Sequence, residues 1–149
     1  MKEKSIHQDH RDEKRRIFLW LSVAIPLVIG GAWYYLFCPN VAFVRGMDQW
    51  IGTDVRRHGW EGFALHSWMR CYGLDFLWAY SFSCGLYVFT EHKKEIAFFL
   101  PVICGSILEI LQSKNMISGT GDGRDVFAEI LGTALAVFVM TGGLKYEKT

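Results

Sequence analysis

The sequence has almost no net charge with which to attract a charged partner. Its 16 Lys and Arg residues are balanced by 15 Asp and Glu residues, so the formal net charge is +1. No stripe of basic residues interleaved with aromatic residues replaces that missing charge. Both observations argue against a protein that binds nucleic acid through bulk charge, and we expect no nucleic-acid partner.

The sequence also lacks the common signatures of metal and nucleotide sites. It has no C-x-x-C pair, no H-E-x-x-H motif and no internal repeat. The glycines between Gly119 and Gly123 do not follow a strand and form an incomplete fingerprint, so we interpret them as a turn. The four cysteines are interpreted as small buried hydrophobic residues, and a disulfide between Cys38 and Cys71 stays open as an alternative.

Apolar residues are abundant and fall in long blocks. Hydrophobic residues make up 51% of the chain and aromatic residues 15%, which excludes disorder as the main state. The four blocks are 17–38, 71–90, 96–111 and 126–143. The first has no charge over 22 residues, which is about 33 Å of helix against a hydrocarbon core of about 30 Å. Pro26 inside it is tolerated in lipid, with a kink.

These blocks predict an all-α fold, an integral membrane bundle of four transmembrane helices. The membrane domain is expected at 17–143, with charged tails at 1–16 and 144–149. With four spans, the two tails and the turn after block two share one side, which carries ten Lys and Arg residues against six opposite. The positive-inside rule therefore places both termini in the cytoplasm, and we expect a multi-pass protein of the plasma (inner) membrane.

The loop of residues 39–70 on the outer side is rich in aromatic residues. Phe43, Met47, Trp50 and Ile51 recur at helical spacing. Because Trp favours the headgroup level, we expect a short interfacial helix here. Two roles stay open for this loop: anchors that fix depth and tilt, or a lid that shapes a substrate groove.

Polar residues near the outer ends of three spans form the candidate site. Glu109 and Gln112 share a face of the third helix, and Asp125 and Glu129 share a face of the fourth. The expected topology brings the following candidate ligand-binding residues to one side of the membrane: Asp75, Glu109, Gln112, Asp122, Arg124, Asp125 and Glu129.

A structural role explains part of this cluster. Asp122 is suited to cap the fourth helix, and Asp125 lies near the positive end of its dipole. Glu109 and Glu129 each lie about one turn inside an apolar block, where facing carboxylates need a proton, a basic partner or a bound cation. Arg124, Lys114 and the outer-loop arginines are the basic candidates.

At these residues the sequence resembles the VanZ-like family of small bacterial membrane proteins. Glu109 and Gln112 match the family's Glu-x-x-Gln at a helix end, and Asp125 and Gly132 match the Asp and Gly of the next helix. Glu129 stands where the family usually has Asn, and Arg124 is displaced from the usual arginine position early in the loop. The resemblance implies a role in the cell envelope; the founding member is associated with low-level resistance to the glycopeptide teicoplanin.

Three functions follow from these features. The first is a VanZ-like membrane protein whose outward acidic pocket binds a cationic or metal-bridged ligand: an antibiotic such as a glycopeptide, an envelope precursor or a lipid headgroup. The second is an intramembrane enzyme acting on a lipid-linked phosphate, with carboxylates holding Mg²⁺ or Mn²⁺. The third is a cation-coupled transporter, which needs oligomerisation because four helices are few for a full path. We expect no organic cofactor, and a divalent cation stays open.

Overall fold

The computed structural model describes residues 2–37, 42–52, 68–117 and 121–145. In chain order the elements are α1 (Lys2–Phe37), α2 (Ala42–Ile51), the π-helical turn η1 (Met69–Gly73), α4 (Leu74–Phe89), α5 (Lys94–Ser113) and α6 (Gly123–Lys145). The described ranges contain helices and turns and no strand, so the all-α prediction is confirmed for them.

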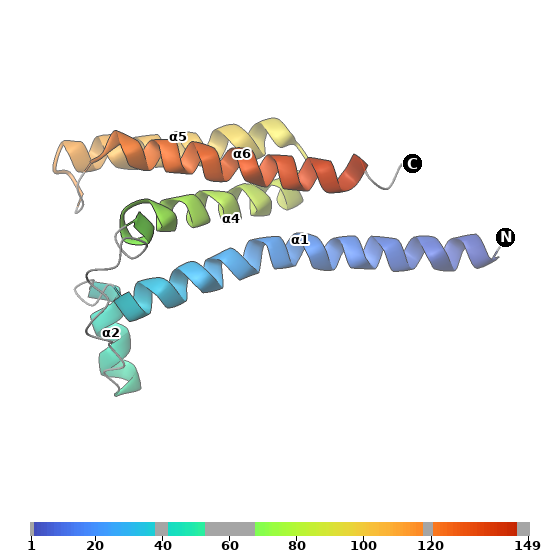
Figure 1. Ribbon diagram of the computed structural model, residues 1–149, viewed down its shortest axis with the longest axis horizontal. Coiled ribbons are helices and arrows are strands. Elements are labelled where there is room, and N and C mark those ends of the chain that lie inside the picture. Colours follow the sequence, from blue (N-terminus) through green and yellow to red (C-terminus); the bar gives the residue numbers. More distant parts are fainter. Residues whose placement is uncertain (1, 38–41, 53–67, 118–120, 146–149) are drawn as a thin grey trace.

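The four long helices lie along a common direction (Figure 1). Both chain termini and the turn between α4 and α5 lie at one end of the molecule, which we call the terminal end. The end of α5, the start of α6 and helix α2 lie at the opposite end, which we call the α2 end. This alternation brings the sequence-predicted site residues of three helices to the α2 end.

Helix α4 is the central element of the bundle, because it packs against α1, α5 and α6. Its contact with α6 is close. A Cβ on Gly132 would meet the backbone carbonyl of Phe76, so only glycine fits at this crossing. Toward α1, the space beside Gly30 is closed by Leu74 and Leu77 at ordinary van der Waals distance. Small residues at the crossings let the helix backbones approach, as is common in membrane bundles.

The apolar core lies toward the terminal end. One cluster of buried side chains joins α1, α4, α5 and α6, and it consists of Leu19, Cys84, Tyr87, Ala97, Ala136 and Met140. Trp20 packs edge-on against Phe89 beside it, with ring centroids 6.2 Å apart. The bundle is therefore apolar inside at its terminal end and acidic at its α2 end.

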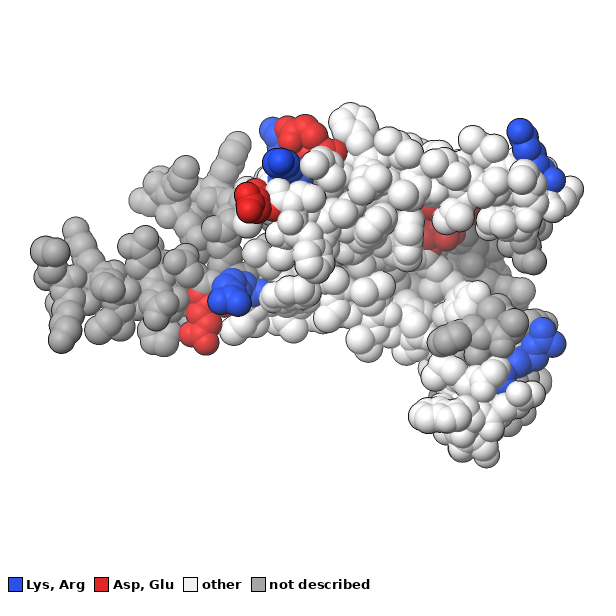
Figure 2. All heavy atoms as spheres, turned by 180° about the vertical axis from the view of Figure 1, so that it is seen from behind, with Lys and Arg blue, Asp and Glu red and all other residues white. Residues whose placement is uncertain are grey.

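In the part of the chain that the structure describes, three helical stretches are long and apolar enough to cross a membrane: Arg16–Leu36, Lys94–Ser113 and Gly123–Gly142. Helix α4 is apolar but shorter, with 16 residues. Many large apolar side chains on these helices are exposed, among them Val28 at 68% and Phe138 at 72%. Lipid is the natural cover for such surfaces. Figure 2 shows charged atoms toward the ends of the visible face and a broad uncharged band between them, with one recessed acidic spot toward the α2 end.

The helices are longer than the apolar blocks that predicted them. Helix α1 begins at Lys2, so the expected charged tail continues the first span as helix. No Gly or Pro interrupts residues 2–25, and Pro26 lies inside α1 without ending it. Helix α1 as a whole is bent (Figure 1). Helices α5 and α6 likewise extend past their blocks by a few polar residues, because polar side chains suit helix ends in the headgroup region.

Helix α2 confirms that residues 42–51 of the outer loop are helical. It runs across the end of the bundle instead of along it (Figure 1). Val44 is buried, and the Tyr35 hydroxyl on α1 donates a hydrogen bond of 3.0 Å to Asp48 Oδ1. Trp50 on another face is 87% exposed. Residues 53–67 of this loop lie outside the described residues.

Candidate functional site

The α2 end brings together the acidic residues of three helices. Asp75 lies in the first turn of α4, Glu109 lies near the end of α5, and Asp125 and Glu129 lie in the first two turns of α6. Their carboxylates are close enough to repel one another. We call these four residues the acidic cluster. The sequence prediction that Asp75, Glu109, Asp125 and Glu129 converge agrees with this arrangement.

The outer part of the site is held by hydrogen bonds within the chain. The Asp122 backbone N–H donates to Glu109 Oε2 at 2.7 Å, which ties the end of α5 to the start of α6. Asp122 Oδ1 then accepts the Arg124 backbone N–H at 3.0 Å and caps α6. Asp122 and one oxygen of Glu109 therefore have structural roles.

A left-handed residue helps to end α5 beside the site. Asn115 has φ 55°, its N–H donates to the Gln112 carbonyl, and the Met116 N–H donates to the Leu111 carbonyl. This pattern is a helix C-terminus of the Schellman type, for which Asn is one of the favoured residues. It turns the chain back so that Gly121, where a Cβ would meet the backbone of Ser113 and Glu109, can lead into α6.

Glu129 is the most buried member of the acidic cluster. Its side chain is 5% exposed, and its Oε2 has no hydrogen-bond partner. The carboxylate lies directly against Gly105 of α5, where a Cβ would overlap it. Asp75, Glu109 and Asp125 all repel it. Within the described residues, no hydrogen-bond donor reaches Glu129 Oε2 to balance a negative charge there.

No basic side chain balances the acidic cluster among the residues described. Arg124 is exposed, its Nη1 donates to the Tyr72 hydroxyl of η1 at 3.4 Å, and it interacts electrostatically with Asp122, which is not a member of the acidic cluster. Lys114 is exposed and forms no ion pair with the residues that the structure describes. Of the outer-loop arginines, Arg45 on α2 is exposed, Arg56 and Arg57 lie outside the described residues, and the side chain of Arg70 does too. Arg124 and Lys114, which the sequence offered as basic partners, therefore do not pair with the acidic cluster.

Gln112 lies on α5, one turn beyond Glu109 and half-buried. Its side chain makes no hydrogen bond to the cluster within the described ranges. Gly105 and Tyr72, by contrast, border the site although no sequence motif predicted them. A glycine in the middle of an apolar span was the available signal for Gly105, because it permits close approach of another group.

The turn η1 precedes Asp75 and sets the rotation of the helix that carries it. The Leu74 N–H donates to the Met69 carbonyl, five residues earlier, so this turn holds one residue more than an α-helical turn. Such an insertion rotates all the side chains that follow and is frequent at functional sites. Periodicity alone does not reveal it, since the block 71–90 reads as one continuous apolar span.

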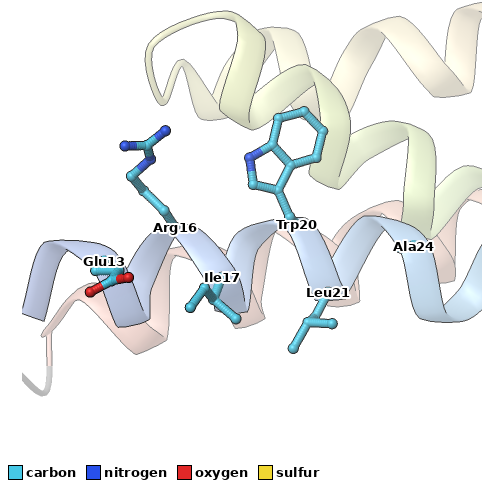
Figure 3. Close-up of a pocket in the computed structure, with 6 residues that line it drawn as sticks. All are labelled: Glu13, Arg16, Ile17, Trp20, Leu21 and Ala24. Carbon is cyan, nitrogen blue, oxygen red and sulfur yellow. The ribbon is translucent and has the colours of Figure 1, made fainter. Parts of the chain in front are cut away.

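Several other candidates have no part in the site. In the described ranges, no group of three or more His, Cys, Asp and Glu side chains is placed to hold a metal ion, so the geometry gives the metal-dependent alternative no support. Cys84 and Cys104 are free thiols, whereas Cys38 and the side chain of Cys71 lie outside the description. A groove on α1 is lined by Arg16, Trp20 and neighbouring residues (Figure 3). It lies toward the terminal end, whereas the acidic cluster lies at the α2 end (Figure 1).

Comparisons with models of known protein families, with curated proteins and with solved structures give no match to this chain. The features that bear on function are therefore the fold, the acidic cluster and the sequence resemblance.

Proposed function

We propose that this chain is a VanZ-like membrane protein of the bacterial cell envelope whose acidic cluster binds a cationic ligand at the outer surface. The observation that carries the proposal is the state of Glu129, which is buried at 5% exposure, lacks a hydrogen-bond partner on Oε2 and is surrounded by three like charges. Buried charges in proteins are normally paired. A bound cation supplies the pair that the described residues do not.

The proposal includes a fourth membrane span. Turn η1 runs directly into α4, so residues 69–89 form one helical stretch. At about 1.5 Å per residue this stretch reaches about 30 Å, the thickness of a hydrocarbon core. Helix α4 also packs against all three helices that are long enough to cross. A helix enclosed by three spanning helices crosses with them.

The orientation follows the charge bias of the flanks. With the terminal end in the cytoplasm, the side with more Lys and Arg faces inward, as the positive-inside rule requires. The acidic cluster then faces the outer leaflet of the plasma membrane. Envelope precursors, lipid headgroups with an amine, and glycopeptides such as teicoplanin are the ligand classes within its reach, and all present cationic groups or bridge to it through a cation.

Paired substitutions on α5 and α6 test the proposal. In a strain where deletion of the gene changes susceptibility to a glycopeptide, we expect Glu129→Gln to reproduce the deletion while the protein accumulates normally. Glu95→Gln is the matched control, since Glu95 is an exposed acid in the first turn of α5 at the terminal end. Wild-type susceptibility in both Glu129→Gln and Asp125→Asn would remove the acidic cluster from the function.

A further inference from the structure

The groove on α1 is a hollow that plays no part in the acidic cluster. Its volume is about 480 Å³, and it is lined by Glu13, Arg16, Ile17, Trp20, Leu21 and Ala24. Figure 3 shows the side chains of Arg16 and Trp20 on one side of the groove and those of Ile17 and Leu21 on the other. Ligand sites in proteins have volumes of about 300–1,000 Å³. The groove is therefore large enough to hold a ligand.

The two ends of the groove differ in polarity. Glu13 and Arg16 line the end nearer the N-terminus, and the stretch of α1 that is apolar enough to cross a membrane begins at Arg16. From Arg16 to Ala24 the helix rises about 12 Å, at about 1.5 Å per residue. One leaflet contributes half of a hydrocarbon core of about 30 Å. The groove therefore begins at the headgroup level and ends within the same leaflet.

The sides of the groove suit an acyl chain. Ile17, Trp20 and Leu21 are each about half exposed, so their apolar surface is open to lipid. Trp20 also packs edge-on against Phe89 of α4, which steadies one side of the groove. Ala24, at the deep end, is exposed and adds only a methyl group, so the groove stays open there. An acyl chain lying along α1 between these side chains removes their apolar surface from other contacts.

The charges at the polar end match a zwitterionic headgroup. Arg16 is exposed, and a guanidinium pairs with a phosphate through two parallel hydrogen bonds. Glu13 is also exposed and lies three residues earlier, so the two side chains are neighbours on the helix surface. A carboxylate accepts hydrogen bonds from a primary ammonium group. A purely anionic headgroup brings no cation for Glu13, and a choline headgroup has no N–H to donate.

We propose that this groove binds one phosphatidylethanolamine molecule from the leaflet at the terminal end. The lipid phosphate pairs with Arg16, the lipid amine donates to Glu13, and one acyl chain lies between the two sides of the groove. In the orientation proposed above this is the cytoplasmic leaflet. The binding depends on residues of α1 and not on the acidic cluster, so it stands or falls separately from the proposed function. A lipid bound here fixes the depth at which α1 enters the membrane.

Native mass spectrometry of the full-length chain in detergent tests the site. The protein is mixed with equal amounts of phosphatidylethanolamine, phosphatidylglycerol and phosphatidylcholine that have identical acyl chains. We expect one retained lipid, with phosphatidylethanolamine preferred at least ~5-fold over each of the others. Arg16→Gln should lower its retention about 5-fold, and Glu13→Gln should abolish the preference over phosphatidylglycerol. Lys94→Gln and Glu95→Gln are the matched controls, because both residues are exposed charges at the terminal end outside the groove.

A second pair of variants tests the acyl-chain part of the site. Ala24→Trp fills the deep end of the groove and should lower retention of phosphatidylethanolamine, whereas Val28→Trp should not, because Val28 is 68% exposed and lies outside the groove. Equal effects of these two variants would overturn the proposal. Equal retention of the three lipids, or a preference for phosphatidylglycerol, would also overturn it. So would equal losses in Arg16→Gln and Lys94→Gln, since they would indicate general attraction to charge.

Discussion

At the scale of single residues, the site depends on one close contact between a carboxylate and a glycine. Glu129 of α6 occupies the space that any other side chain at position 105 of α5 would fill. The sequence places Glu129 one turn inside an apolar block, but it does not say what lies opposite. The contact explains how an acid fits inside a bundle whose helices pack closely.

Gly105→Ala tests that contact. The added methyl overlaps the Glu129 carboxylate, so we expect a loss of about 1–3 kcal/mol in the free energy of unfolding, typical of an overfilled core. Thermal unfolding in detergent measures it. Gly85→Ala on α4 is the matched control, because a Cβ there has no heavy atom within 4 Å; it should be neutral or raise stability by up to about 1 kcal/mol. Equal effects of the two variants would contradict the contact.

The turn between α4 and α5 holds two residues in the left-handed region, Glu91 with φ 54° and His92 with φ 74°. Glycine adopts this conformation at no steric cost, whereas other residues lose about 1 kcal/mol or more. We therefore expect Glu91→Gly to raise the melting temperature. Glu95→Gly, the same change inside helix α5, should lower it, because glycine costs about 0.5–1 kcal/mol within a helix. If Glu91→Gly and Glu95→Gly shifted the melting temperature in the same direction, backbone conformation would not be the cause of the two effects.

At the scale of elements, α2 lies across the α2 end of the bundle with two distinct faces. Val44 and Asp48 face the bundle, and Asp48 accepts the hydrogen bond from Tyr35. Trp50 lies on another face and is exposed. A helix with this division suits the membrane interface, where an aromatic ring sits at the headgroup level. The anchoring role is thereby favoured over the lid, because Trp50 is exposed and does not pack against the bundle.

Fluorescence quenching by brominated lipids measures the depth of Trp50. The fluorescence of Trp50 is obtained as the difference between the native chain and Trp50→Phe. We expect bromine near the headgroup to quench this fluorescence strongly and bromine deep in the acyl chains to quench it little. Trp78 of α4 provides the comparison, because it lies in the middle of the bundle and is partly exposed. The fluorescence of Trp78, obtained in the same way from Trp78→Phe, should be quenched more by deep bromine than by bromine near the headgroup. A deep position for both residues would exclude an interfacial α2.

At the scale of the whole molecule, the polar and apolar parts of the core are separated along the bundle axis. The α2 end contains the acidic cluster, and the terminal end contains the apolar cluster of α1, α4, α5 and α6. This division favours binding at one surface over passage through the membrane. It also makes the orientation of the bundle decisive for function, because the cluster meets either the envelope or the cytoplasm.

Labelling of single cysteines on intact cells measures that orientation. Met116→Cys is suited to the α2 end because Met116 is 68% exposed, and Lys94→Cys marks the terminal end. An impermeant thiol reagent should label Met116→Cys before lysis and Lys94→Cys only afterwards. The reverse pattern would place the acidic cluster in the cytoplasm and end the proposed envelope role. If both cysteines were labelled before lysis, α5 would not cross the membrane.

The sequence by itself determined the helical class, the order of the apolar blocks and the end at which the acids converge. Hydrophobic length fixes these features, since an uncharged stretch of 20 residues has few alternatives to a helix in lipid, and successive spans must alternate in direction. Glu109, Asp125 and Glu129 follow from that alternation. Helix ends were less well predicted, because hydropathy does not detect polar residues such as Lys94 and Ser113 that extend a helix beyond its apolar block.

Only the tertiary structure decided which acids are satisfied and which are not. Glu109 and Asp122 share a hydrogen bond between α5 and the loop before α6, Arg124 is diverted to Tyr72, and Glu129 is left facing Gly105. These outcomes depend on rotation and crossing of helices, which are set by residues far apart in the chain. The inserted residue in η1 and the fit of Gly132 against Phe76 fix those rotations, and neither leaves a periodic signal in the sequence.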